Sequence, residues 1–215
     1  MNSKLSNVII NVVLFAVVVF LAIKVIQSIK APIDFRNEKK ARETQIVQRL
    51  KDIREAEIQY KQAYNRYTGS FDSLIAFCNN YEIPIVNMIP DPEDTTFTKT
   101  INDTIGFVLV SDSLFGNRNG FNINDLRYVP FSDPVTEFEL QDSIIKRGGI
   151  SVPVFELKTP YEVYLNTPGK QFNEDQWRIR VNNAKAELEQ LERYAGLKVG
   201  SLEEASTDGN WEKEL

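Results

Sequence analysis

The sequence predicts an α+β protein in which a single N-terminal transmembrane helix continues into a long amphipathic helix, followed by a small antiparallel sheet and a C-terminal helix. Three observations predict this class: an apolar run at 8–26, helical spacing of apolar residues over 38–67, and strand patterns over much of the remainder. We divide the 215 residues into four parts. They are a transmembrane anchor at 1–30, a helical stalk at 31–69, an α+β head at 70–200 and a C-terminal tail at 201–215.

The apolar run at 8–26 is broken only by Asn11 and Lys24. As a helix it spans about 28 Å, which matches a hydrocarbon core of about 30 Å. It is longer than the apolar region of a cleaved signal peptide, and no small-residue cleavage pattern follows it. We therefore expect a retained anchor, with Lys24 extending toward the membrane surface.

Pro32 predicts a kink or break in the chain where it leaves the membrane. The following segment, 38–67, contains no glycine or proline and is predicted to be helical. A heptad-like stripe, interrupted at Glu57, runs along it: Ile46, Leu50, Ile53, Tyr60, Tyr64 and Tyr67. We expect the tyrosine half to pack on the chain's own head. For Ile46, Leu50 and Ile53 two interpretations stay open, a seam for a partner helix or a face that folds onto the head.

The head begins with a short helix at 71–77 that Ser70 or Asp72 can cap. Segment 79–103 is predicted to be a loop because it carries Pro84, Pro90 and Pro92. Five strands are then predicted, at 104–110, 126–131, 135–140, 150–157 and 161–165.

Asn173 is predicted to cap the C-terminal helix, whose apolar stripe begins at Trp177 and Val181. Gly196 suits the position just beyond a helix end. Ser201 followed by Glu204 has the pattern of a capping box and predicts one more short helix.

The composition argues against most catalytic chemistry. The chain contains no histidine and one cysteine, Cys78, so the commonest general base and any multi-cysteine metal site are missing. No phosphate-binding loop, dinucleotide fingerprint or nucleophile elbow occurs. The net charge of −5 argues against a nucleic-acid binder. We expect no enzyme activity, no cofactor, no metal site and no nucleic-acid partner.

Segment 64–74, YNRYTGSFDSL, resembles the end of the long helix in type IV pilins and type II secretion pseudopilins. Those proteins also begin with an apolar helix that runs into an amphipathic one. No Gly-Phe peptidase site precedes the apolar run here, and no glutamate lies near its start. The resemblance therefore implies a pilin-like head on a permanent anchor.

Five tripeptides consist of Asp, then Ser or Thr, then an aliphatic residue or Thr, where average residue usage gives about one. They resemble the acceptor sequon of an O-glycosylation system in one phylum of Gram-negative bacteria, which acts on exported domains. The candidate acceptors are Ser73, Thr95, Thr104, Ser113 and Ser143. The resemblance implies a periplasmic head.

The positive-inside rule predicts the opposite orientation. Lys4 is the one Lys or Arg before the apolar run, whereas Lys30, Arg36, Lys39, Lys40 and Arg42 follow it, which favours a cytoplasmic C-terminal side. We weigh the five tripeptides more heavily and expect a single-pass protein of the bacterial inner membrane with its C-terminal domain in the periplasm.

Together these features predict a membrane-anchored, non-catalytic subunit or accessory protein of an envelope complex for secretion, translocation or envelope assembly. Its expected partners are the membrane and, through the stalk helix, other membrane-complex proteins or a second copy. The alternative is a pilin-like filament subunit, and an enzyme is a third class.

Overall fold

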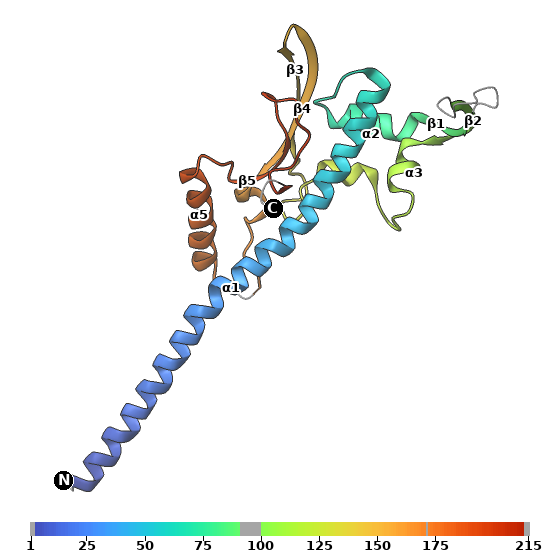
Figure 1. Cartoon of the computed structure of the whole chain (residues 1–215). Helices are drawn as coiled ribbons and strands as arrows, with labels where there is room; N and C mark the ends of the chain where they lie inside the picture. The colour runs from blue at the N-terminus through green and yellow to red at the C-terminus, as the bar shows by residue number, and fades with distance from the viewer. Residues whose placement is uncertain (1–2, 91–99, 171, 213–215) are drawn as a thin grey trace.

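The computed structural model describes residues 3–90, 100–170 and 172–212. A long helix, α1, runs the length of the molecule, and the head surrounds its C-terminal half (Figure 1). The elements in chain order are α1 (Ser3–Tyr64), α2 (Phe71–Asn80), β1 (Glu82–Pro90), β2 (Thr100–Leu109), α3 (Val110–Phe115), the 3-10 helix η1 (Ile123–Arg127), β3 (Glu139–Arg147), β4 (Ile150–Pro160), α4 (Tyr161–Tyr164), α5 (Glu174–Gln190) and β5 (Gly196–Gly200). The predicted α+β class, with its long N-terminal helix, small antiparallel sheet and C-terminal helix, is confirmed.

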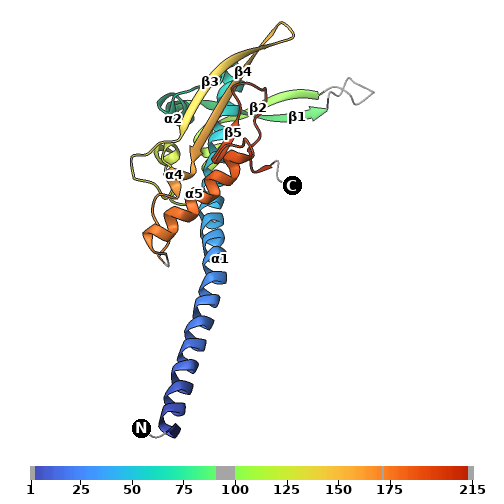
Figure 2. The same ribbon diagram turned by 90° about the vertical axis from the view of Figure 1, so that its left-hand side faces the viewer.

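The N-terminal half of α1 extends away from the head, and every side chain from Ile10 to Lys30 is exposed (Figure 2). Its most apolar 18-residue window has a mean hydropathy of 2.6, and none of that window is buried. In the described part of the chain, α1 is the one helix long and apolar enough to cross a membrane. A bare apolar helix of this length is compatible with a membrane anchor.

Helix α1 continues through Pro32, so the predicted break is wrong. Proline lacks the N–H that would donate within the helix and costs about 3 kcal/mol in a helix interior. The residues that follow hold the helix in place: Phe35 and Arg42 are both buried against the head. Fixing the chain immediately after Pro32 offsets the local loss of a hydrogen bond.

The C-terminal half of α1 supplies the centre of the head's core. Ile46, Leu50 and Ile53 are completely buried, in one apolar cluster with side chains of α2, β4, β5 and α5. Their predicted role as a partner-helix seam is therefore corrected, because the chain itself covers them. The predicted boundary between a stalk ending at 69 and a head beginning at 70 is corrected for the same reason.

The main sheet has the order β3-β4-β5, and both pairs are antiparallel. The β3–β4 hairpin pairs Glu139 with Lys158 and closes at Gly148-Gly149. Both glycines have positive φ, 58° and 84°, as a tight hairpin turn requires. The buried residues of β4 include Phe155 and Leu157, which belong to the apolar core, and β5 extends the sheet beside β4.

Several predicted elements differ in the structure. The predicted loop 79–103 holds β1 and the start of β2, whereas the rest of β2 lies in the predicted strand 104–110; β1 and β2 form a separate two-stranded sheet. Each strand of such a sheet has an unpaired edge, where a proline removes no ladder hydrogen bond. Gly196, expected beyond a helix end, instead opens β5, a strand that the sequence patterns missed.

Tertiary context overrides local pattern at three further places. The predicted strand 126–131 is the end of η1 followed by an isolated bridge between Tyr128 and Glu137. The predicted strand 161–165 is the short helix α4. The predicted helix at 201 is a bend in which the Ser201 hydroxyl accepts the N–H groups of Glu203 and Glu204.

The caps at Ser70 and Asn173 are confirmed. The Ser70 side chain accepts from the N–H of Ser73, and the Asn173 side chain accepts from the N–H of Asp175. Trp177 and Val181 of the α5 stripe are buried.

The burial of Leu50 gives a direct test of the corrected seam. Leu50→Ala should lower the free energy of unfolding of the head by about 2–5 kcal/mol, because it leaves a cavity in the core. Thermal unfolding of the full chain in detergent should show a lower midpoint, by roughly 2–4 °C for each kcal/mol. Gln45→Ala, an exposed position on the same helix, is the control and should change little. An unchanged midpoint for Leu50→Ala would contradict the burial of this face in the head.

Candidate interaction surfaces

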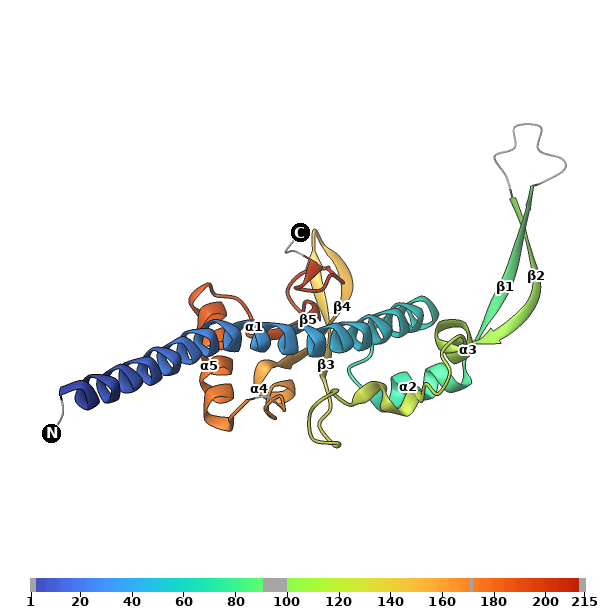
Figure 3. The ribbon, with the colours of Figure 1, turned by 90° about the horizontal axis from the view of Figure 1, so that it is seen from below.

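Strands β1 and β2 form a hairpin that projects from the end of the head farthest from the N-terminus (Figure 3). They pair antiparallel from Glu82 and Leu109 at the base to Pro90 and Thr100, with a bulge between Ile85 and Val86. Within the described residues no third strand pairs with them. A two-stranded sheet on its own is marginally stable in water, so this projection has the properties of a surface that a partner covers.

The hairpin exposes large apolar side chains. Met88 is 69% exposed and Ile105 and Phe107 are each 65% exposed. Pro84 lies opposite Phe107, so Phe107 shares a face with Pro84 and, by the period of two, with Met88. Ile85 and Ile89 are also exposed and lie on the other face. We call β1, β2 and these side chains the apolar hairpin; exposed apolar strands of this kind mark interaction sites.

The base of the apolar hairpin is fixed to the end of α1. Tyr81, immediately before β1, packs its ring on Phe77 of α2 at 4.8 Å and on Tyr64 of α1 at 6.0 Å between centroids. The N–H of Val110, immediately after β2, donates to the Tyr81 carbonyl at 3.0 Å. The stretch of α1 from Lys30 to Tyr64 is about 51 Å long at 1.5 Å per residue. The hairpin is therefore held about 50 Å along α1 from the end of the apolar segment.

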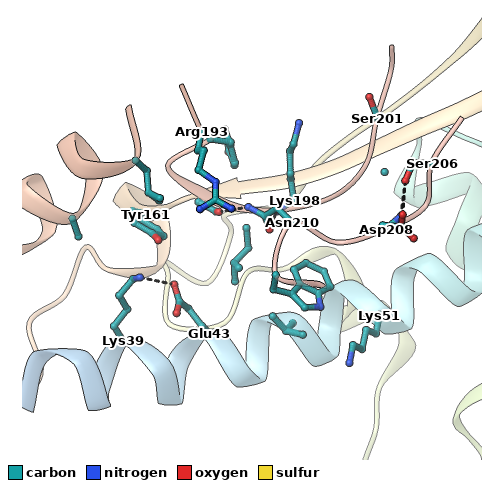
Figure 4. A pocket seen from close by; sticks show the side chains of 18 of the residues that line it. Lys39, Glu43, Lys51, Tyr161, Arg193, Lys198, Ser201, Ser206, Asp208 and Asn210 are labelled. Carbon is teal, nitrogen blue, oxygen red and sulfur yellow. Dashed lines mark hydrogen bonds and ion pairs between the residues drawn. The ribbon is translucent and has the colours of Figure 1, made fainter. Parts of the chain in front are cut away.

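A second surface feature is an open groove of about 830 Å³ between α1, α5, β5 and the C-terminal segment (Figure 4). On the α1 side, Lys39 pairs with Glu43 at 3.3 Å and lies over the Tyr161 ring at 4.6 Å. Burial alone would lower the pKa of Lys39, but Glu43 and Tyr161 together hold it above its ordinary value. The ammonium group is thus a fixed, neutralised charge.

The far wall of the groove is held together by Asn210. Its side-chain oxygen accepts from the Lys198 N–H at 3.1 Å, and its amide donates to the Gly196 carbonyl at 2.9 Å. Its own N–H donates to the Lys198 carbonyl at 2.9 Å. Asp208 accepts from the Ser206 hydroxyl at 3.0 Å. These polar groups are used in attaching the C-terminal segment to β5, so the groove is a structural joint between elements.

The most perturbed carboxyl group of the core is Glu57. It is completely buried at the one polar position of the apolar stripe on α1. Its Oε2 accepts from the Thr68 N–H at 3.0 Å, which fixes the turn after α1, while Oε1 has no hydrogen-bond partner in the described part of the chain. Burial raises the pKa of Glu57 to about 8, and the nearby charge of Asp142 adds to the effect. Glu57 is therefore protonated at neutral pH.

The same buried environment raises the pKa of the Cys78 thiol. The thiol is buried in α2, and burial, followed by the charge of Glu57, raises its pKa to about 12. In the described residues no group of three His, Cys, Asp or Glu side chains is arranged to hold a metal ion.

The candidate acceptors for glycosylation lie on separate elements. Ser73 is on α2, Thr104 on β2, Ser113 on α3 and Ser143 on β3, and all four are exposed. Asp72, in the tripeptide of Ser73, forms an ion pair with Arg127. Thr95 lies outside the described residues. The structure does not bring these residues together into one site, and each is open to an enzyme.

The raised pKa of Glu57 predicts how stability varies with pH. Above about pH 4.5 the unfolded chain releases this proton, whereas the folded chain keeps it up to about pH 8, so stability falls across this range. Glu57→Gln keeps the acceptor for Thr68 and removes the titration. Between pH 5 and pH 8, denaturant unfolding should show the free energy of unfolding of the variant rising relative to that of the wild type by about 3–4 kcal/mol. If the free energies of unfolding of the two proteins changed with pH in parallel, the raised pKa of Glu57 would be contradicted.

No protein-family model matches the sequence, and comparison with curated proteins and with solved structures finds no match.

Proposed function

We propose that the protein is a membrane-anchored, non-catalytic subunit of a bacterial inner-membrane complex, with its head in the periplasm and the apolar hairpin as its contact with a partner subunit. Envelope assembly, secretion and translocation are the processes that need such subunits. The observation that carries the proposal is the exposure of Met88, Ile105 and Phe107 on a projection that the described residues leave uncovered.

The continuity of α1 from the apolar segment into the core of the head supports a role in presenting the apolar hairpin to a partner. The apolar segment and the core residues Ile46, Leu50 and Ile53 belong to one helix, so the head is not carried on a linker. A subunit built in this way offers its hairpin at a set distance from the bilayer. The polar groups at Asn210 and Glu57 form structural hydrogen bonds, to β5 and to the turn after α1, which agrees with a non-catalytic role.

The periplasmic location rests on the Asp-Ser and Asp-Thr tripeptides. The exposure of Ser73, Thr104, Ser113 and Ser143 supports their use as acceptors, since an O-glycosylating enzyme needs access to the hydroxyl.

A pilin-like filament subunit is the second candidate. The continuity of α1 from the apolar segment into the head favours it, because the long helix of pilins has this arrangement. The two candidates differ in the N-terminus, since a filament subunit would be trimmed and methylated, whereas a permanent anchor keeps Met1.

Purification of the full chain from its native host in mild detergent tests the proposal. We expect a defined set of membrane proteins to copurify, with Met1 intact and with a mass above the 24.6 kDa of the bare sequence by one or more glycan units. Met88→Ser with Phe107→Ser should release a partner while leaving the thermal midpoint within the small range typical of surface changes.

The matched control is Val135→Ser, which removes an apolar side chain that is 81% exposed elsewhere on the head. It should retain every partner. Full retention of partners by the hairpin variant would contradict the proposed contact, and a mass equal to the bare sequence would remove the support for a periplasmic head.

A further inference from the structure

A cleft of about 860 Å³ lies between α1 and α5, at the point where α1 leaves the apolar segment. One wall is the stretch of α1 from Lys24 to Asp34, and the other is the face of α5 that carries Gln176, Ile179 and Arg180. The cleft is separate from the groove at Asn210 and from the apolar hairpin. Neither the sequence patterns nor the proposed function accounts for it.

The cleft has an excess of positive charge. Lys24, Lys30 and Arg180 line it, and Asp34 is the one carboxylate in its lining. None of the three cations has an ion pair or hydrogen bond with another described residue; Lys24 only lies over the Phe20 ring, at 5.6 Å. Lys39, Arg42 and Arg178, near the same end of the head, are by contrast neutralised by ion pairs. Unneutralised cations that converge on one cleft favour an anionic ligand.

The position of the cleft identifies the source of that anion. Lys24 lies within the apolar run, and Ile26 and Ile29 beside it are exposed, so this part of α1 is at the level where hydrocarbon meets headgroups. Ile179 of α5, which is 57% exposed, brings an apolar side chain to the same level. A soluble phosphate compound would gain nothing from this apolar border, whereas a lipid places its phosphate against cations and its chains against apolar residues.

Aromatic packing beneath the cleft holds α5 beside the end of the apolar segment of α1. Trp177 packs on Phe35 of α1 at 5.0 Å between ring centroids, and its indole N–H donates to the Leu165 carbonyl at 2.6 Å. The guanidinium of Arg42 lies over the other side of this contact, 5.0 Å from the Trp177 ring. Arg180 lies one turn along α5 from Trp177, so this packing fixes the position of its backbone beside the cleft.

We infer that this cleft binds the headgroup of an anionic phospholipid, with Lys24, Lys30 and Arg180 facing the phosphate and Ile179 facing the first carbons of the chains. The polar side chains of Gln27 and Gln176 supply hydrogen-bond donors at the same level. The site holds α5, and through it the head, against the membrane surface. The inference needs the membrane anchor but not the proposed partner of the hairpin.

Native mass spectrometry of the full chain in detergent, titrated with phosphatidylglycerol or phosphatidylcholine, tests the inference. We expect a one-to-one phosphatidylglycerol adduct that is at least about fivefold tighter than the phosphatidylcholine adduct. Lys30→Gln and Arg180→Gln should each weaken phosphatidylglycerol binding about fivefold, the loss expected for one cation near an anionic headgroup.

Arg178→Gln is the matched control. Arg178 lies on the same helix and is exposed, but it pairs with Asp175 at 2.9 Å and does not line the cleft. This variant should bind like the wild type, and so should Met88→Ser with Phe107→Ser, which separates this inference from the proposed function. Thermal unfolding of each variant checks that the head is intact.

Three results would overturn the inference. Equal binding of the two lipids would show that the headgroup charge does not matter. Equal weakening of phosphatidylglycerol binding by Arg178→Gln and Arg180→Gln would show general attraction to a positive surface in place of a specific site. Arg180-dependent binding of glycerol phosphate as tight as that of the lipid would assign the cleft to a soluble phosphate compound.

Discussion

The sharing of one helix between the exposed apolar segment and the core of the head is the constraint on which the rest of the structure depends. From Ile10 to Lys30 the helix is exposed and mostly apolar, and its C-terminal half buries Ile46, Leu50 and Ile53 completely. Burial of such side chains contributes about 1.5–3 kcal/mol each, so the head cannot leave the helix without losing much of its stability. The apolar segment and the head therefore behave as one body as long as α1 is continuous.

This constraint gives the two ends of the head different surroundings. The end near Pro32 carries α5, held to α1 through Phe35 and Trp177, and it lies at the level where the apolar segment ends. The far end carries the apolar hairpin, fixed to α1 through Tyr64 and Tyr81. Cationic side chains collect at the first end and bare apolar side chains at the second. A lipid surface and a protein partner are the respective environments that each set of side chains suits.

Much of the fold was predictable from the sequence because the relevant signals are local. The length of the apolar run, the 3.6-residue period of α1 and the side-chain caps Ser70 and Asn173 depend on near neighbours in the chain. The covering of Leu50 was not predictable, because a buried face looks the same whether its own head or another chain covers it. The first strand of the hairpin, β1, was missed because its prolines suit a loop as well as the free edge of a two-stranded sheet.

Some features of the candidate surfaces were likewise predictable from local sequence, and others depend on tertiary structure. Glu57 could have been singled out from the sequence, since it is the one polar residue on an otherwise apolar stripe. The exposure of Met88 and Phe107 and the convergence of Lys30 with Arg180 depend on tertiary structure, because 150 residues separate the last two. Only the position of α5 against α1 brings them to one cleft.

The continuity of α1 can be measured directly by pulsed electron paramagnetic resonance. Spin labels at Ser28→Cys and Gln62→Cys occupy exposed positions on either side of Pro32, and the native Cys78 is buried. A continuous helix places the two backbone sites about 51 Å apart. We predict a single narrow distance distribution near that value for the full chain in lipid nanodiscs. A broad distribution, or one centred below about 40 Å, would mean that the chain bends at Pro32 and would contradict the shared-helix account.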